Sequence, residues 1–177
     1  MKMLSKSLLV LSTIAMIACG DKKEKKDQMT IGNGSTSEAS TEKSSESTSA
    51  SNEDMVEVII EGNDQMRFNK DEIKVKAGQT VKLTLKHVGE MSKEAMGHNW
   101  VLLTQGTNIN EFGQKAVDAK DNDYIPEGSD QVIAHTKLIG GGKTTTIEFT
   151  APEKGTYDFI CSFPGHYSLM KGKFIVE

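Results

Sequence analysis

The sequence contains no apolar run long enough to cross a bilayer as a helix. The apolar stretch from Leu8 to Ala18 is too short for that, but it follows Lys2 and Lys6 and has the length of a signal-peptide core. We therefore expect residues 1–18 to be a signal peptide and the rest of the chain to be exported.

Cysteine is scarce, with two in 177 residues. Cys19 follows the apolar stretch directly, where a bacterial lipoprotein carries its lipidated cysteine, although Met16 stands where such signals usually have Leu. We expect a lipid anchor at Cys19 that holds the chain on a membrane; the alternative is an ordinary secretory signal cut nearby. Cys161 is then alone, which excludes an internal disulfide and exposes an exported thiol to oxidation unless something ligates it.

Large apolar side chains are almost absent from residues 21–52, which are rich in Ser, Thr, Glu and Lys. Such a segment cannot bury enough surface to offset the entropy lost on ordering. We expect residues 19–52 to form a lipid-anchored, disordered tether.

Basic residues do not outnumber acidic ones in the rest of the chain. In residues 53–177, 19 Asp and Glu face 14 Lys and Arg, a net charge of −5. This balance excludes nucleic acid as a partner. The length of this part of the chain suits one ordinary domain with a real core.

Short apolar segments typical of strands recur through this domain. They are Met55 to Glu61, Glu72 to Val75, Thr80 to His87, Asn99 to Leu103, Gln131 to Ala134, Thr144 to Phe149, Tyr157 to Cys161 and Lys173 to Glu177. Their spacing predicts an all-β fold, a Greek-key β-sandwich or barrel, with Trp100 in the core. Between Asn108 and Lys120 apolar residues recur at helical spacing, so we expect one short helix outside the sandwich.

Three metal-binding side chains lie within ten residues near the end of the chain: Cys161, His166 and Met170. Pro164-Gly165 predicts a turn between two strands that brings these side chains toward one point. A thiolate favours copper, zinc or iron, imidazole suits copper or zinc, and a thioether suits copper as a weak axial ligand, so the set indicates copper. A trigonal site needs a second imidazole, and spacing does not choose among His87, His98 and His135.

Four longer motifs in this order make the chain resemble the azurins. They are Gly62-Asn63-Asp64-Gln65-Met66, Met96-Gly97-His98-Asn99-Trp100-Val101-Leu102, Val132-Ile133-Ala134-His135-Thr136-Lys137-Leu138-Ile139-Gly140 and Cys161-x-Phe163-Pro164-Gly165-His166-x-x-Leu169-Met170-Lys171-Gly172. The likeness covers nearly all of residues 55–177. It implies a cupredoxin: an eight-stranded Greek-key β-sandwich that carries single electrons on one type 1 copper ion.

The resemblance also implies a role for individual residues. His98, Cys161 and His166 would form the trigonal plane of the copper site, with Met170 and the carbonyl oxygen of Gly97 as distant axial groups. The backbone N–H groups of Asn99 and Phe163 would point at the Cys161 sulfur, and the Asn99 side chain would tie the two ligand loops together. His87, as a partly buried histidine, and His135, as a surface one, would not be ligands.

A partner surface follows from the same resemblance. Apolar side chains near the His166 edge would meet redox partners such as c-type cytochromes or a reductase: Met66, Met91, Met96, Leu169 and Phe163. The disulfide of azurins is absent, because its positions align with Val56 and Gly78. Azurins are usually soluble, whereas the tether here suggests a carrier anchored in the bacterial periplasm.

Two other functions compete with electron transfer. A copper chaperone or store would favour an open, Met-rich or His-rich site, and the closed Cys161, His98 and His166 set argues against it. A copper oxidase or nitrite reductase would need a second copper and more histidines than remain. An enzyme would also need an open coordination position beside a general acid or base, so we expect no enzymatic activity.

Overall fold

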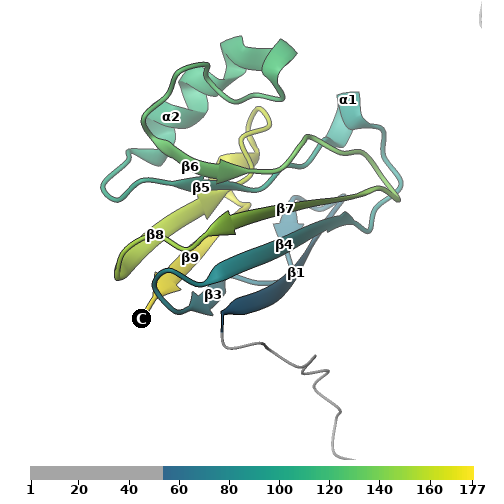
Figure 1. The fold of residues 1–177 in the computed structure, drawn as a ribbon. Helices are drawn as coiled ribbons and strands as arrows, with labels where there is room; N and C mark the ends of the chain where they lie inside the picture. The colour runs from purple at the N-terminus through teal and green to yellow at the C-terminus, as the bar shows by residue number, and fades with distance from the viewer. Residues whose placement is uncertain (1–53) are drawn as a thin grey trace, which may run out of the picture. The chain divides into compact units, whose positions relative to one another are not determined.

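The computed structural model describes residues 54–177, which form two packed β-sheets with helical segments at one end (Figure 1). The expected signal peptide, the anchor at Cys19 and the tether of residues 19–52 lie outside the described residues. Within the described part, no helix is both long enough and apolar enough to pass through a membrane.

The first sheet has four strands in the order β2-β1-β4-β7. These are β1 (Met55–Asn63), β2 (Arg67–Phe68), β4 (Thr80–His87) and β7 (Thr144–Thr150). Strands β1 and β4 are parallel, with Val58 opposite Leu83, whereas β7 runs antiparallel to β4. The inward positions of β4 alternate strictly with half-buried ones, as expected for a sheet with one face on the core.

The second sheet has five strands in the order β3-β9-β8-β5-β6. These are β3 (Glu72–Val75), β5 (Val101–Leu103), β6 (Val132–His135), β8 (Gly155–Ile160) and β9 (Lys171–Val176). All three residues of β5 are buried because the strand is covered on both faces. Leu102 packs in the core between the sheets, and Val101 and Leu103 pack in a second apolar cluster.

The main core lies between the sheets and is centred on aromatic rings. Trp100 is fully buried, as predicted, and its ring centroid lies 5.7 Å from that of Phe159 and 5.8 Å from that of Phe149. The second cluster lies under helix α2 (Ile109–Ala116) and includes Phe112, Ala116 and the side chains of Cys161 and Met170. Cys161 and Met170 are therefore buried in an apolar cluster of their own, beside the main core.

The structure confirms the predicted all-β sandwich, but it differs from the expected elements in four places. The sheets stay separate, so the barrel alternative is wrong. A ninth strand, β2, and a four-residue helix, α1 (Lys93–Met96), were not predicted, because segments this short carry no periodicity. The predicted helix of residues 108–120 ends earlier as α2 and continues as the 3-10 helix η1 (Val117–Asn122).

Candidate metal centre

Three buried side chains from two parts of the chain meet at one end of the sandwich. Cys161 follows β8, His166 begins the 3-10 helix η2 (His166–Ser168), and His98 precedes β5. Their ligand atoms all lie within 4.8 Å of one another, and Cys161 Sγ is 3.6 Å from His166 Nδ1. Among residues 54–177 this is the one such cluster of His, Cys, Asp and Glu side chains.

Residues 161–170, which we call the ligand loop, are shaped by their own backbone hydrogen bonds. Gly165 adopts φ = 82°, the left-handed conformation that glycine tolerates best, and His166 N–H donates to Phe163 O at 3.0 Å. The loop then closes, because Met170 N–H donates to His166 O at 2.7 Å and Cys161 N–H donates to Met170 O at 2.9 Å. The turn predicted from Pro164-Gly165 is therefore present, and it places Cys161, His166 and Met170 side by side.

The Met170 side chain is fully buried beside His98. A Cβ atom at Gly62 would lie 2.8 Å from His98 Cδ2 and 3.2 Å from Met170 Cε. Only glycine leaves room at this position for both side chains. Gly62, in the first of the four motifs, therefore leaves the space that the side chains of Met170 and His98 occupy.

The hydrogen bonds of His98 indicate whether its ring can bind a metal ion at this site. Its Nε2 lies 2.9 Å from Asn63 O, and its Nδ1 lies 3.0 Å from Gly97 O. A neutral imidazole can donate only one proton, and burial lowers the pKa of His98, which disfavours the doubly protonated ring. With Nε2–H donating to Asn63, Nδ1 is left unprotonated beside the Gly97 carbonyl oxygen, which itself lies 3.9 Å from Cys161 Sγ. A metal cation would stabilise such a group of electron-pair donors.

The Cys161 thiol points to the same conclusion. Burial raises its pKa to about 12, although backbone N–H groups of Asn99 and Phe163 donate hydrogen bonds that favour the thiolate. A bound metal ion is the charge that would make the thiolate stable at neutral pH. One thiolate, two imidazoles and a neighbouring thioether together fit copper better than zinc.

Asn99 connects the two ligand segments. Its Oδ1 accepts from Ser162 N–H at 2.8 Å, and its Nδ2 donates to Ser162 Oγ at 2.8 Å and to Asp123 O at 2.9 Å. Ser162 Oγ in turn donates to Tyr124 O at 2.8 Å. Ser162 and Tyr124 were not predicted as site residues, because a hydrogen bond to a distant backbone carbonyl leaves no pattern in the sequence.

Helix α2 braces the ligand loop from outside. A Cβ atom at Gly113 would collide with the ring of Tyr167, which follows His166 directly. Gly113 lowers the helix propensity of this segment, and the structure supplies the reason, since the ring of Tyr167 occupies the space of a side chain. The helix and the 3-10 turn η2 therefore contact each other at this glycine.

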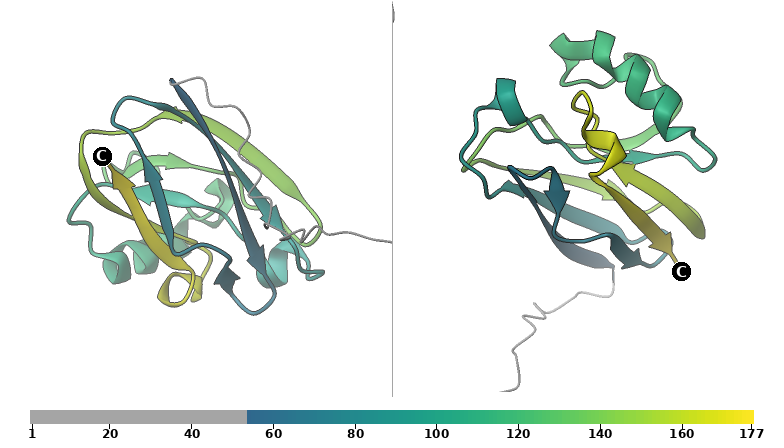
Figure 2. Two further views of the ribbon diagram at one scale, coloured as in Figure 1. Left: turned by 90° about the horizontal axis from the view of Figure 1, so that it is seen from below. Right: turned by 180° about the vertical axis from the view of Figure 1, so that it is seen from behind.

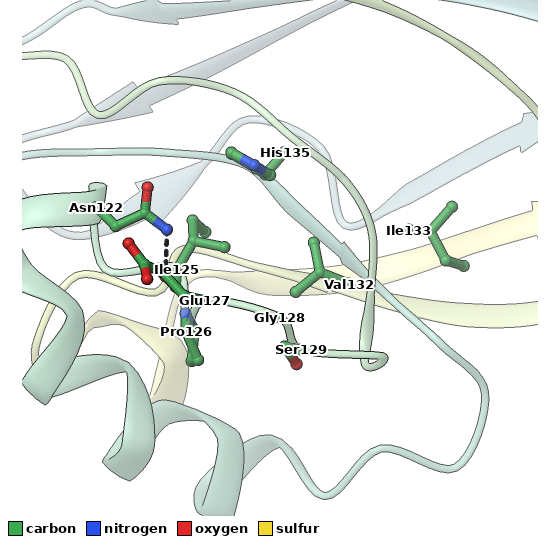
Figure 3. A pocket seen from close by; sticks show the side chains of 9 residues that line it. All are labelled: Asn122, Ile125, Pro126, Glu127, Gly128, Ser129, Val132, Ile133 and His135. Atoms are coloured by element: carbon green, nitrogen blue, oxygen red, sulfur yellow. Dashed lines mark hydrogen bonds between the residues drawn. The ribbon is translucent and has the colours of Figure 1, made fainter.

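The other two histidines lie outside the cluster. His87 is buried rather than partly buried; its Nε2 donates to Met96 O at 2.8 Å and its Nδ1 accepts from Gly89 N–H at 3.1 Å. Its ring stacks on that of His98 with centroids 4.2 Å apart. His135 is exposed and lines a separate surface pocket together with Glu127 and Val132 (Figure 3).

The expected partner surface is only partly exposed. Met91 and Leu169 are 41% and 43% exposed, Met66 and Met96 are half-buried, and Phe163 is 9% exposed. The Phe163 ring packs against the His166 ring with centroids 4.6 Å apart. Of these side chains, Phe163 contacts the His166 ring, and the neighbouring Leu169 donates its backbone N–H to His166 O at 2.9 Å.

The metal-free protein should be less stable at pH 5 than at pH 7. Burial, and after it the charges of His98 and His87, lower the pKa of His166 to about 4. In the unfolded chain a histidine has a pKa of about 6.5. Between these values the unfolded chain binds a proton that the folded one does not, so the free energy of unfolding falls as the pH falls.

Urea unfolding of the metal-free protein at both pH values measures this effect. We expect a loss of about 1–2 kcal/mol at pH 5. His166→Gln should reduce the difference but not remove it, because burial also lowers the pKa of His98. Equal pH dependence in the two proteins would show that His166 is not the group responsible.

Comparison with known proteins places the chain in context. The family described as copper binding proteins, plastocyanin/azurin family, matches residues 54–177. Azurin-1 of Alcaligenes xylosoxydans xylosoxydans is 43% identical over 119 residues, 65% of this chain and 92% of that protein. Azurin of Alcaligenes faecalis is 44% identical over 122 residues, 66% of this chain and 94% of that protein.

Solved structures agree with the sequence relatives. Auracyanin A, a "blue" copper protein from Chloroflexus aurantiacus, superimposes with a TM-score of 0.64 at 34% identity, covering 70% of this chain and 99% of its own. An azurin from Methylomonas sp. strain J gives a TM-score of 0.64 at 33% identity, covering 68% of this chain and 97% of its own.

Proposed function

Because the chain belongs to the plastocyanin/azurin family of copper-binding proteins, we propose that it shuttles single electrons between redox proteins of a bacterial cell envelope. The observation that carries this proposal is the buried set of His98, Cys161 and His166, whose ligand atoms lie within 4.8 Å of one another. Copper bound there would supply a one-electron couple between Cu(I) and Cu(II).

The chain's own residues hold the donor atoms in fixed positions. Asn63 O orients the His98 ring, the N–H groups of Asn99 and Phe163 direct the Cys161 sulfur, and the bond from Cys161 N–H to Met170 O closes the loop. A rigid donor set keeps the geometry similar in both oxidation states, so little must move when an electron is transferred. The packing around Cys161 also keeps water away from the sulfur.

Partners would meet the site at its apolar rim. Met91 and Leu169 are exposed, and the buried rings of Phe163 and His166 contact each other. Redox encounters use small, weak interfaces, which suits an apolar rim of this kind. We propose c-type cytochromes or a reductase as donors and acceptors.

Voltammetry of the copper-loaded protein in solution tests the function. A carrier gives a reversible one-electron wave and no turnover of nitrite or oxygen. Irreversible release of copper on reduction would indicate a chaperone or store instead. Catalytic current with nitrite or oxygen would indicate an enzyme.

We further propose that the carrier is exported and attached to a membrane. Residues 1–18 would be removed as a signal peptide, and two or three acyl chains on Cys19 would give stable attachment where one would not. A flexible tether of the length of residues 19–52 would have an r.m.s. span of roughly 30 Å. Attachment would raise the local concentration of the copper site for partners in the same membrane.

Cys19→Ala should release the protein from the membrane fraction. Cells that produce the full-length chain or this variant are fractionated, and the mass of the mature N-terminus is measured. We expect the unaltered chain in membranes with a lipid-modified Cys19, and the variant in the soluble extract. An unaltered chain that is soluble, with an unmodified N-terminus, would contradict the anchor without touching the copper site.

A further inference from the structure

A groove with a positive lining borders the ligand loop. It has a volume of about 530 Å³ and is lined by residues of two segments. Ser168 and Leu169 come from the ligand loop, and the charged residues are Arg67, Lys70, Asp71 and Lys171. Three cations against one carboxylate leave a local charge of +2.

The three cations of this groove, which we call the basic groove, are free to meet a partner. All three are exposed, and within residues 54–177 none of them forms an ion pair. By contrast, the nearby Lys173 is held by Asp158 with Nζ 2.6 Å from Oδ1. Three of the domain's unpaired cations therefore line one groove beside the ligand loop, although the domain as a whole has a net charge of −5.

A pocket of the opposite charge lies on helix α2 and η1, and α2 contacts the ligand loop. This pocket is lined by Asp118, Asp121 and Glu127 against Lys115, a local charge of −2. By contrast, β2, which carries Arg67, lies in the four-stranded sheet (Figure 2). The end of the molecule that holds the metal centre is thus electrically asymmetric.

We propose that the basic groove docks an acidic, carboxylate-rich face of a redox partner. Leu169 is 43% exposed, lines the groove and donates its backbone N–H to His166 O, so a partner that fills the groove also contacts the loop that holds His166. The acidic pocket beside η1 repels the same face, which leaves one orientation favourable. This inference rests on the proposed electron-carrier function and adds the charge of the partner to it.

We expect the groove to change the rate at which a partner associates more than the affinity of the complex. Exposed ion pairs contribute little to stability, but complementary potentials raise association rates and orient the partner. The effect is screened within about 10 Å at 0.1 M salt, so docking should weaken as the ionic strength rises.

A gold electrode coated with a carboxylate-terminated monolayer serves as the acidic probe. All proteins in this comparison carry Cys19→Ala, which removes the proposed lipid anchor. The copper-loaded full-length protein in this background is compared with Arg67→Glu/Lys70→Glu, in which Lys171 is retained because it adjoins Met170. The matched control is Lys76→Glu/Lys154→Glu, which changes the charge equally at two exposed lysines: Lys76 follows the end of β3 and Lys154 precedes β8. Both lie at the ends of these strands that are remote from the ligand loop.

At low salt we expect the unaltered protein and the control to adsorb and give a reversible copper wave. The groove variant should lose about tenfold in electroactive coverage, and salt should remove the difference. Equal coverage of the groove variant and the control would overturn the inference. Loss of binding to phosphatidylglycerol vesicles at 0.15 M salt by the groove variant alone would also overturn it, because the groove would then face lipid.

The same proteins in free solution separate this inference from the proposed function. All of them should give the same blue spectrum and the same reversible wave at a hydroxyl-terminated electrode. If the unaltered protein gives no reversible wave there, the electron-carrier function itself is wrong. If all give the wave and only the carboxylate surface distinguishes them, the basic groove is the docking site.

Discussion

Cys161→Ser is expected to remove the blue colour of the copper-loaded protein completely. The colour requires charge donation from sulfur to copper, and a serine hydroxyl neither ionises at neutral pH nor donates charge as a thiolate does. The fold should persist, because the N–H groups of Asn99 and Phe163 that face the sulfur can donate to an oxygen in the same place. Optical absorption after Cu(II) addition, with circular dichroism as the check on folding, measures the effect.

Cys19→Ser is the matched control, since it removes the other cysteine of the chain. It should leave the blue band at full intensity. If Cys161→Ser stayed blue, the thiolate would come from elsewhere and the assignment of the metal centre would be wrong. If Cys19→Ser lost the band, the two cysteines would share a role that neither sequence nor structure assigns to them.

His98→Gly is expected to lose the blue band and to recover it when imidazole is added. Removal of the ring opens a space between Asn63 O, Gly97 O and the ring of His87. Free imidazole can enter that space, donate its N–H to Asn63 O and present its other nitrogen to the metal. Titration with imidazole should therefore restore the band with saturation, which a merely unfolded variant would not show.

Two histidine variants serve as controls for His98→Gly. His135→Gln should leave the spectrum unchanged, because His135 is exposed and lines a separate pocket. His87→Gln should also keep the blue band, since both ring nitrogens of His87 are engaged by backbone groups of Met96 and Gly89. Loss of the band in either folded Gln variant would show that the wrong histidine has been assigned.

The ligand loop is the part of the site that sequence predicts best. Cys161, His166 and Met170 lie within ten residues, so local turn geometry alone brings them together. The second histidine is different, because three candidates remain and the spacing does not separate them. The fold separates them: His98 is held by paired hydrogen bonds with Ile139, and it alone of the three lies within reach of Cys161.

Local patterns in the sequence also predict most strands of the fold, whereas β2 depends on a contact between distant residues. Every predicted strand has a counterpart, because short runs of strand-forming apolar residues between turn residues are a local pattern. The two residues of β2 form a strand only because β1 supplies their partners, Gly62 opposite Phe68 and Asn63 opposite Arg67. A pattern two residues long contains no period, so only the tertiary structure reveals it.

Contacts made by small or polar residues were also hidden from the sequence. Gly113 weakens the predicted helix, and only the ring of Tyr167 against it explains why a glycine stands there. The basic groove combines Arg67 and Lys70 with Lys171, which are far apart in the chain and become neighbours through the ligand loop. Charge counted along the sequence gives the net value of −5 and conceals this asymmetry.

Addition of Cu(II) to the purified, metal-free protein tests the central claim most directly. A type 1 site formed by His98, Cys161 and His166 should give an intense blue thiolate-to-copper charge-transfer band, with about one copper ion bound for each chain. Copper that binds with only the weak absorption of nitrogen and oxygen ligands, and without a charge-transfer band, would contradict the claim.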